Sequence, residues 1–149
     1  MEREIKFRGI RCSLRYEGQN KWVYGNYVES NRSWNGGHPH KSWIMPSPIT
    51  NGGWFAPAGV IAVKDESVGQ FTGYKDNEGK EIFEGDIIRA QYEDCDAYTG
   101  WHGLREVTDE VVFEYGSFRL KNTYPFDIGR LWDMNNSKVN VIGNIHEKL

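Results

Sequence analysis

The amino-acid sequence predicts a mainly β fold, and three observations support this prediction. Short apolar runs alternate with polar residues at a period of two, which is typical of half-buried strands. Seventeen glycines among 149 residues favour turns over long helices. Aromatic residues make up 14% of the chain, and such large side chains close a core in few positions. Short strands at this spacing indicate a small barrel or sandwich.

The first 64 residues predict a β lobe that carries a long irregular segment. Turn residues at 15–20 connect the first two strands. A glycine- and tryptophan-rich insertion over about 30–58 has no usable period, and Pro46 and Pro48 interrupt the only strand-like run inside it. The predicted strands of this lobe are residues 5–8, 21–29, 44–45 and 59–63.

Residues 65–149 predict a second β domain with cleaner alternation. Asp76 to Gly79 form a turn in which glycine takes a positive φ, so residues 71–74 pair with 81–84. Gly85 turns the chain again into a strand whose core face is Ile88, Ala90 and Tyr92. The remaining predictions are strands at 111–115, 118–121 and 139–145, and a helical turn at 126–132.

Composition excludes several classes of protein. No run approaches the roughly 18 apolar residues of a membrane span. The polar start MEREIKFRG does not resemble a secretory signal, so we expect a cytoplasmic protein with no membrane partner. Two cysteines, Cys12 and Cys95, are too few for a disulfide scaffold and are expected to be free.

The net charge of −3 is unevenly distributed along the chain. Residues 1–64 contain nine Lys or Arg and four Asp or Glu, a charge of +5. Residues 65–149 contain nine Lys or Arg and seventeen Asp or Glu, a charge of −8. Such asymmetry indicates either a charged outside partner or two lobes, or two subunits, that face each other with opposite sign.

Five blocks of sequence occur in order from one end of the chain to the other: Ile5–Gly9, Lys21–Gly25, Val68–Gly73 with Lys75 and Asp76, Gly79–Ile87, and Val141–Ile145. Together these blocks resemble the YopX protein family, whose members are small proteins of phages and prophages in bacteria. The resemblance implies a β-rich fold with a C-terminal small SH3-like barrel, a mobile-element origin and location in a bacterial host cell. It supplies no established reaction and no catalytic residues.

No catalytic, metal-binding or cofactor-binding motif is recognisable in the sequence. His38 and His40 flank a proline and lack the third and fourth ligands that zinc usually requires. Cys95 lies between two aspartates, whereas a nucleophilic thiolate needs a cationic setting. A calcium loop starting at Asp76 would require glycine sixth and glutamate twelfth, but Glu81 and Ile87 stand there. We therefore expect no catalytic residue, no metal and no cofactor.

The acid-free segment from residue 30 to 64 is the main candidate for function. Its aromatic and basic side chains fit three alternatives: packing within the protein, contact with a protein partner, or stacking on single-stranded nucleic acid. The candidate binding residues are Arg32, Trp34, Lys41, Trp43, Trp54 and Phe55.

These patterns predict a non-enzymatic, phage- or prophage-derived accessory protein that acts by protein binding or self-assembly, as a homo-oligomer or with a protein partner. A nucleic-acid-binding module that uses residues 30–64 is the alternative, which the acidic second half disfavours. An enzyme with an unrecognised site is the weaker alternative.

Overall fold

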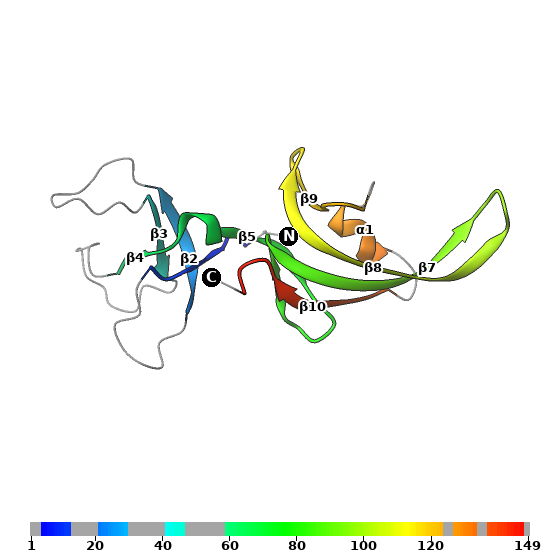
Figure 1. Ribbon diagram of the computed structural model, residues 1–149, viewed down its shortest axis with the longest axis horizontal. Helices are drawn as coiled ribbons and strands as arrows, with labels where there is room; N and C mark the ends of the chain where they lie inside the picture. Colours follow the sequence, from blue (N-terminus) through cyan, green and yellow to red (C-terminus); the bar gives the residue numbers. More distant parts are fainter. Residues whose placement is uncertain are drawn as a thin grey trace. The chain divides into compact units, whose positions relative to one another are not determined.

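A computed structural model describes residues 4–12, 21–29, 41–46, 59–123, 127–133 and 137–147 (Figure 1). The chain divides into two compact units, residues 1–71 and 72–149, which we treat separately. Among the described residues, antiparallel strands dominate both units, and one short α-helix lies in the second. The mainly β prediction is therefore confirmed.

Unit 1 is a sheet with the strand order β4-β3-β2-β1-β5. Val23, Ile44 and Val63 form its core, and Phe7 and Val68 pack against this core from positions that are partly exposed. The strands overlap the predicted runs, but β1 begins and ends two residues later than predicted, and β3 is longer than predicted because it includes Pro46, which was expected to interrupt it. Their bounds are β1 (Phe7–Ile10), β2 (Trp22–Glu29), β3 (Ser42–Pro46), β4 (Ile61–Ala62) and β5 (Gly69–Lys75).

A single turn of 3-10 helix, η2 (Asp65–Ser67), ties the strands of unit 1 together. The buried Ser67 hydroxyl accepts a hydrogen bond from the Ile10 amide at 2.7 Å and donates one to the Lys64 carbonyl at 2.6 Å. The Asp65 carboxylate accepts the Ser42 amide at 3.1 Å. These side chains satisfy backbone groups that the ladder leaves unpaired.

The middle of β2 requires a glycine. Gly25 pairs with Phe7 on one side and with Pro46 on the other, so backbone surrounds it in the sheet. A β carbon here would overlap the carbonyl oxygen of Met45 and lie 2.8 Å from the α carbon of Pro46. Both obstacles are backbone atoms, so only movement of β3 could make room.

Unit 2 contains a four-stranded antiparallel sheet in the order β10-β7-β8-β9, while the later part of β5 adjoins β6. Helix α1 contributes Ile128 and Leu131 to a buried cluster on one face of the four-stranded sheet. Among the described residues β9 and β10 do not pair, so the four strands have an open order. The new bounds are β6 (Glu81–Phe83), β7 (Asp86–Asp96), β8 (Trp101–Glu114), β9 (Ser117–Leu120), α1 (Ile128–Asp133) and β10 (Lys138–Asn144).

The predicted turn at Asp76 to Gly79 is confirmed, and it also anchors β10. Gly79 has φ +83°, the left-handed conformation that glycine adopts without strain. The Asp76 carboxylate accepts the amides of Glu78 and Lys80, both at 2.9 Å, and the Val141 amide at 3.1 Å. Burial raises the pKa of Asp76, but these hydrogen bonds outweigh it, so the pKa lies below its usual value.

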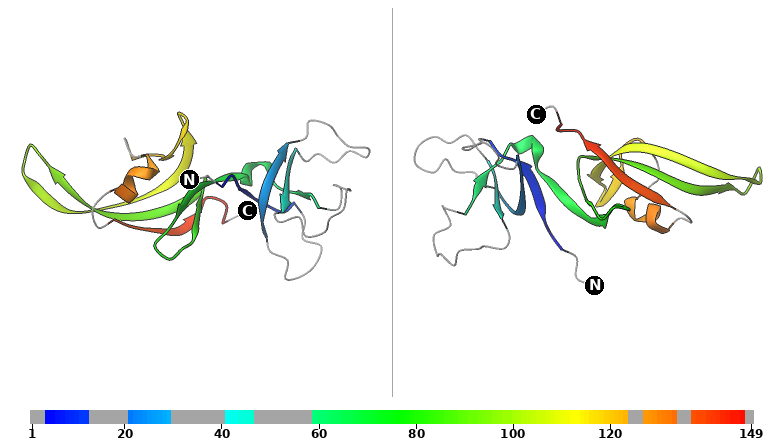
Figure 2. Two further views of the ribbon diagram at one scale, coloured as in Figure 1. Left: turned by 180° about the vertical axis from the view of Figure 1, so that it is seen from behind. Right: turned by 90° about the horizontal axis from the view of Figure 1, so that it is seen from below.

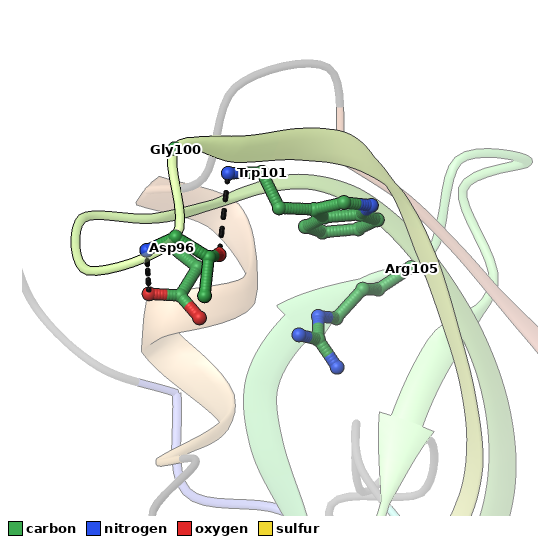
Figure 3. Close-up of a pocket in the computed structure, with 5 residues that line it drawn as sticks. Asp96, Gly100, Trp101 and Arg105 are labelled. Atoms are coloured by element: carbon green, nitrogen blue, oxygen red, sulfur yellow. Dashed lines mark hydrogen bonds between the residues drawn. The ribbon is translucent and has the colours of Figure 1, made fainter.

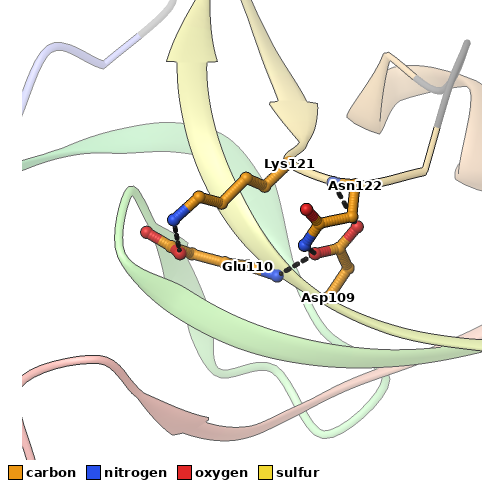
Figure 4. Close-up of polar contacts among 4 residues, drawn as sticks. All are labelled: Asp109, Glu110, Lys121 and Asn122. Atoms are coloured by element: carbon orange, nitrogen blue, oxygen red, sulfur yellow. Dashed lines mark hydrogen bonds and ion pairs between the residues drawn. The ribbon is translucent and has the colours of Figure 1, made fainter.

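A second buried carboxylate, Asp109 on β8, fastens the chain after β9 (Figure 4). It accepts the Asn122 amide at 2.8 Å, the Asn122 side-chain nitrogen at 2.9 Å and the Thr123 hydroxyl at 2.8 Å. The Glu110 amide donates to it as well, at 2.8 Å. Burial raises the pKa of Asp109, yet the four hydrogen bonds to the ionised form lower it overall.

The β8–β9 turn contains a strained residue. Glu114 pairs with Ser117, which leaves a two-residue turn whose members, Tyr115 and Gly116, have φ of +52° and +79°. This is the hairpin geometry that favours asparagine followed by glycine. Tyr115 is the only described residue other than glycine with a positive φ, and its side chain is 90% exposed.

Replacing Tyr115 by asparagine is expected to raise the free energy of unfolding by about 0.5–1 kcal/mol. Asparagine adopts the left-handed conformation at a lower free-energy cost than tyrosine. This gain is larger than the stabilisation lost with the exposed contact between the Tyr115 ring and Arg119. Urea unfolding measures the change. Tyr98→Asn, at a fully exposed position without positive φ, is the control and should leave stability unchanged. A destabilised Tyr115→Asn protein would contradict the interpretation.

Candidate functional site

The β7–β8 hairpin projects beyond the other strands of unit 2 as a two-stranded arm. β10 pairs with β7 only as far as Gln91, and β9 pairs with β8 only from Val111 onward. Between these points β7 and β8 pair continuously with each other out to Asp96 and Trp101. Figures 1 and 2 show the arm extending past α1 and β10 within this unit. We call residues 89–108, which comprise this arm and the β7–β8 pairs at its base, the hairpin arm.

The tip of the hairpin arm is a compact turn built around Asp96. Its carboxylate accepts the amides of Tyr98 at 2.8 Å and Thr99 at 3.3 Å, and its carbonyl accepts the Gly100 amide at 2.8 Å. The hydrogen bond from the Tyr98 amide is the main reason why the pKa of Asp96 lies below its usual value. The Asp96 carboxylate therefore stabilises the turn, and the Tyr98 side chain is fully exposed.

One face of the hairpin arm carries a row of Trp101, Gly103 and Arg105 (Figure 3). The indole lies so close over Gly103 that a β carbon there would be 2.5 Å from the ring. The Arg105 guanidinium lies 5.0 Å from the Trp101 ring centre, and its Nε contacts the Asp94 carboxylate at 2.6 Å. With the turn, Trp101 and Arg105 line an open hollow of about 550 Å³.

The opposite face of the hairpin arm is polar except for Leu104. Glu106 contacts the Arg89 guanidinium at 2.9 Å and accepts a hydrogen bond from the Gln91 amide group at 2.7 Å. The hydrogen bond from Arg89 is the main cause of the lowered pKa of Glu106. Leu104 is 71% exposed among these ionic groups.

β8 also presents an open backbone edge along the hairpin arm. The Glu110 carbonyl accepts a hydrogen bond from the Lys121 amide at 3.0 Å, so the backbone N–H and C=O of Glu110 point toward β9. β8 pairs with β7 without a register shift from Glu110 to Trp101. Every second residue of β8 counted from Glu110 therefore points its backbone N–H and C=O groups to the same side, away from β7. No strand in the described part of the chain pairs with that edge beyond β9. The residues that face it are His102, Leu104, Glu106 and Thr108.

Most of the binding residues predicted from the sequence cannot be placed. Arg32, Trp34, Trp54 and Phe55 lie outside the described residues, as do His38 and His40. Lys41 is exposed, and Trp43 is half-buried on β3, where it pairs with Val28 and Ala62. The binding role of these residues, and nucleic-acid binding by residues 30–64, therefore stay predictions.

The hairpin arm was not predicted from the sequence, because its outer half lacks an alternating pattern. Residues 101–106 are half-buried or exposed throughout, so neither face selects apolar side chains. The available signal was the turn chemistry of Asp96 and Gly100, which follows the predicted strand that contains Ile88, Ala90 and Tyr92. Extending that strand into a hairpin would have located the arm.

Metal-binding clusters and membrane-spanning helices are absent from the described residues. Within them, no group of three or more His, Cys, Asp or Glu side chains could hold a metal ion. Cys12 and Cys95 form no disulfide in the described part of the chain. In the same residues, no helix has the length and apolar character needed to cross a bilayer. What the hairpin arm offers is an exposed surface with aromatic, ionic and backbone groups, suited to contact with another chain.

Comparison with known proteins gives one family. A family model described as YopX protein matches residues 7–148, nearly the whole chain. Comparison with curated proteins gives no match.

Proposed function

The chain belongs to the YopX protein family, and we propose that it is a non-enzymatic accessory protein of phage or prophage origin that acts by protein binding or self-assembly. The hairpin arm is the observation that carries this proposal. It places Tyr98, Trp101 and Leu104 in solvent, at exposed fractions of 101%, 43% and 71%. Exposed aromatic and apolar side chains beside ionic groups are typical of surfaces that contact other proteins.

The distribution of charge supports self-assembly. Unit 1 has nine Lys or Arg and six Asp or Glu, a charge of +3, whereas unit 2 has nine and fifteen, a charge of −6. Unit 1 of one copy therefore attracts unit 2 of another. Opposite charges on two different surfaces of one chain favour a head-to-tail contact between copies.

Association between copies is expected to weaken as salt is added, because ions screen the attraction between oppositely charged units. Multi-angle light scattering should show the average mass falling as sodium chloride rises from about 50 to about 500 mM, where the screening length shortens to a few ångströms. Glucose at matched osmolality does not screen charge and serves as the control. A chain that is monomeric at every salt concentration would contradict self-assembly.

A further inference from the structure

We propose that the open edge of β8 pairs with the same edge of a second copy of this chain, as antiparallel strands centred on Leu104. The inference rests on the self-assembly proposed above and adds a second contact, symmetric and largely independent of net charge. Long unpaired edges are usually shielded, or they pair with another strand. The edge of β8 from residue 102 to 108 presents amides and carbonyls along a strand that already has a partner on its other side.

Symmetry limits the registers that two identical edges can adopt. Antiparallel edges of two copies are related by a two-fold axis perpendicular to the sheet, which keeps each side chain on its own face. One residue must therefore lie opposite itself at the axis. A register centred on Arg105 opposes two guanidinium groups, and one centred on Glu106 opposes two carboxylates. A register centred on Leu104 instead opposes two exposed apolar side chains.

The polar face of the hairpin arm is self-complementary in the Leu104 register. Residues whose numbers add to 208 lie opposite each other, so His102 of each copy faces Glu106 of the other. The imidazole can donate a hydrogen bond to the carboxylate, which is exposed and already oriented by Arg89. The two Leu104 side chains then meet at the axis, which removes the exposed apolar area of each from water.

The other face of the hairpin arm is also complementary. Trp101 of each copy lies opposite the half-buried Val107 of the other, an aromatic and β-branched pair that is favourable across strands. Arg105 lies opposite Gly103, which has no side chain to obstruct it. The paired segment ends near Thr108, short of the position where Lys121 already bonds to β8. The Leu104 register thus uses the whole open edge without displacing β9.

Leu104→Lys tests the contact, because it places two ammonium groups at the axis while changing a side chain that is already 71% exposed. Sedimentation is measured at about 500 mM salt, where attraction between whole units is screened, and at about 100 µM protein, since a small interface gives a Kd on the order of micromolar. The wild-type chain is expected to be dimeric, and Leu104→Lys should raise the dimer Kd about tenfold or more. Ile142→Lys makes a similar change at an exposed side chain on β10, away from the open edge of β8, and should leave the Kd unchanged.

Cysteine cross-linking tests the register in a Cys12→Ser, Cys95→Ser background. Leu104→Cys should form an intermolecular disulfide under mild oxidation, because a hydrogen-bonded pair has α carbons about 5.5 Å apart, within disulfide reach. Glu106→Cys alone should not, because its two copies are about 13 Å apart along the strand. Mixing Glu106→Cys with His102→Cys protein should restore the cross-link, since those positions face each other.

The outcomes separate this inference from the proposed function. A dimer that persists at high salt, dissociates on Leu104→Lys and cross-links in the stated pattern supports the inference. Association that salt abolishes and Leu104→Lys leaves unchanged overturns edge pairing while self-assembly by charge stands. A cross-link from Glu106→Cys alone, or none from Leu104→Cys, overturns the register and the inference with it. A chain that is monomeric at low and high salt overturns edge pairing and self-assembly together.

Discussion

Replacing Gly25 by alanine is expected to lower the free energy of unfolding of unit 1 by about 3 kcal/mol or more. The new β carbon would overlap the carbonyl oxygen of Met45, and that atom belongs to the backbone of β3. A side chain could rotate away, but β3 can yield only by breaking its pairs with β2. Hydrogen exchange at the amides of β2 and β3 measures the loss directly, because opening of the sheet accelerates it.

The neighbouring position provides the control for this substitution. Asn26 is exposed on the same strand, so Asn26→Ala should change stability by no more than about 0.5 kcal/mol. Protection of the β2 and β3 amides should therefore be lost in Gly25→Ala and retained in Asn26→Ala. Equal protection in both variants would show that the sheet accommodates a β carbon at residue 25.

Replacing Asp109 by alanine is expected to lower the free energy of unfolding of unit 2 by about 3 kcal/mol, because it leaves several donors without their charged acceptor. Two of these donors are backbone amides, those of Glu110 and Asn122, which no rearrangement of side chains can remove. Chemical denaturation gives the difference. The adjacent Glu110 makes only a partly exposed ion pair with Lys121, so Glu110→Ala should lose no more than about 1 kcal/mol.

Acid should reveal the same interaction. The pKa of Asp109 is lowered in the folded state, so its stabilisation is fully present above the unfolded value near 3.8 and is lost as the pH falls through the lower folded value. Stability of the wild-type unit should therefore decline below about pH 4. In Asp109→Asn that decline should be shallower, because one of the titrating carboxylates is gone. An equally steep decline in both proteins would contradict the assignment.

Where one face of a strand is buried, the sequence predicted the structure well. Ile88, Ala90 and Tyr92 all lie in the core as expected, because alternation records which side of the sheet excludes water. The turn before them was equally readable, since Asp76 and Gly79 act through local backbone chemistry. The link from Asp76 to Val141 was not predictable, because nothing local to either residue records a contact 65 positions away.

The hairpin arm shows why the candidate site was harder to predict than the fold. The part of β8 in the hairpin arm is exposed to solvent on both faces, so the hydrophobic pattern that identifies other strands is absent there. The prediction instead favoured residues 30–64, where aromatic and basic residues are conspicuous in the sequence. In the sequence, Leu104 is a single leucine next to Arg105 and Glu106. Only the strand order shows that it lies on the open edge of β8.

The attachment of the Asp76 turn to β10 has a consequence for how the protein is made on the ribosome. Unit 1 can assemble once β5 has emerged, because all its strands have then been synthesised. The turn at residues 76–80 can form its local hydrogen bonds early, but its attachment to β10 must wait for Val139 and Val141, whose backbone it binds. Contacts between segments so distant in sequence form slowly. Nascent unit 2 should therefore remain incomplete, with apolar strands accessible to chaperones, until β10 leaves the exit tunnel.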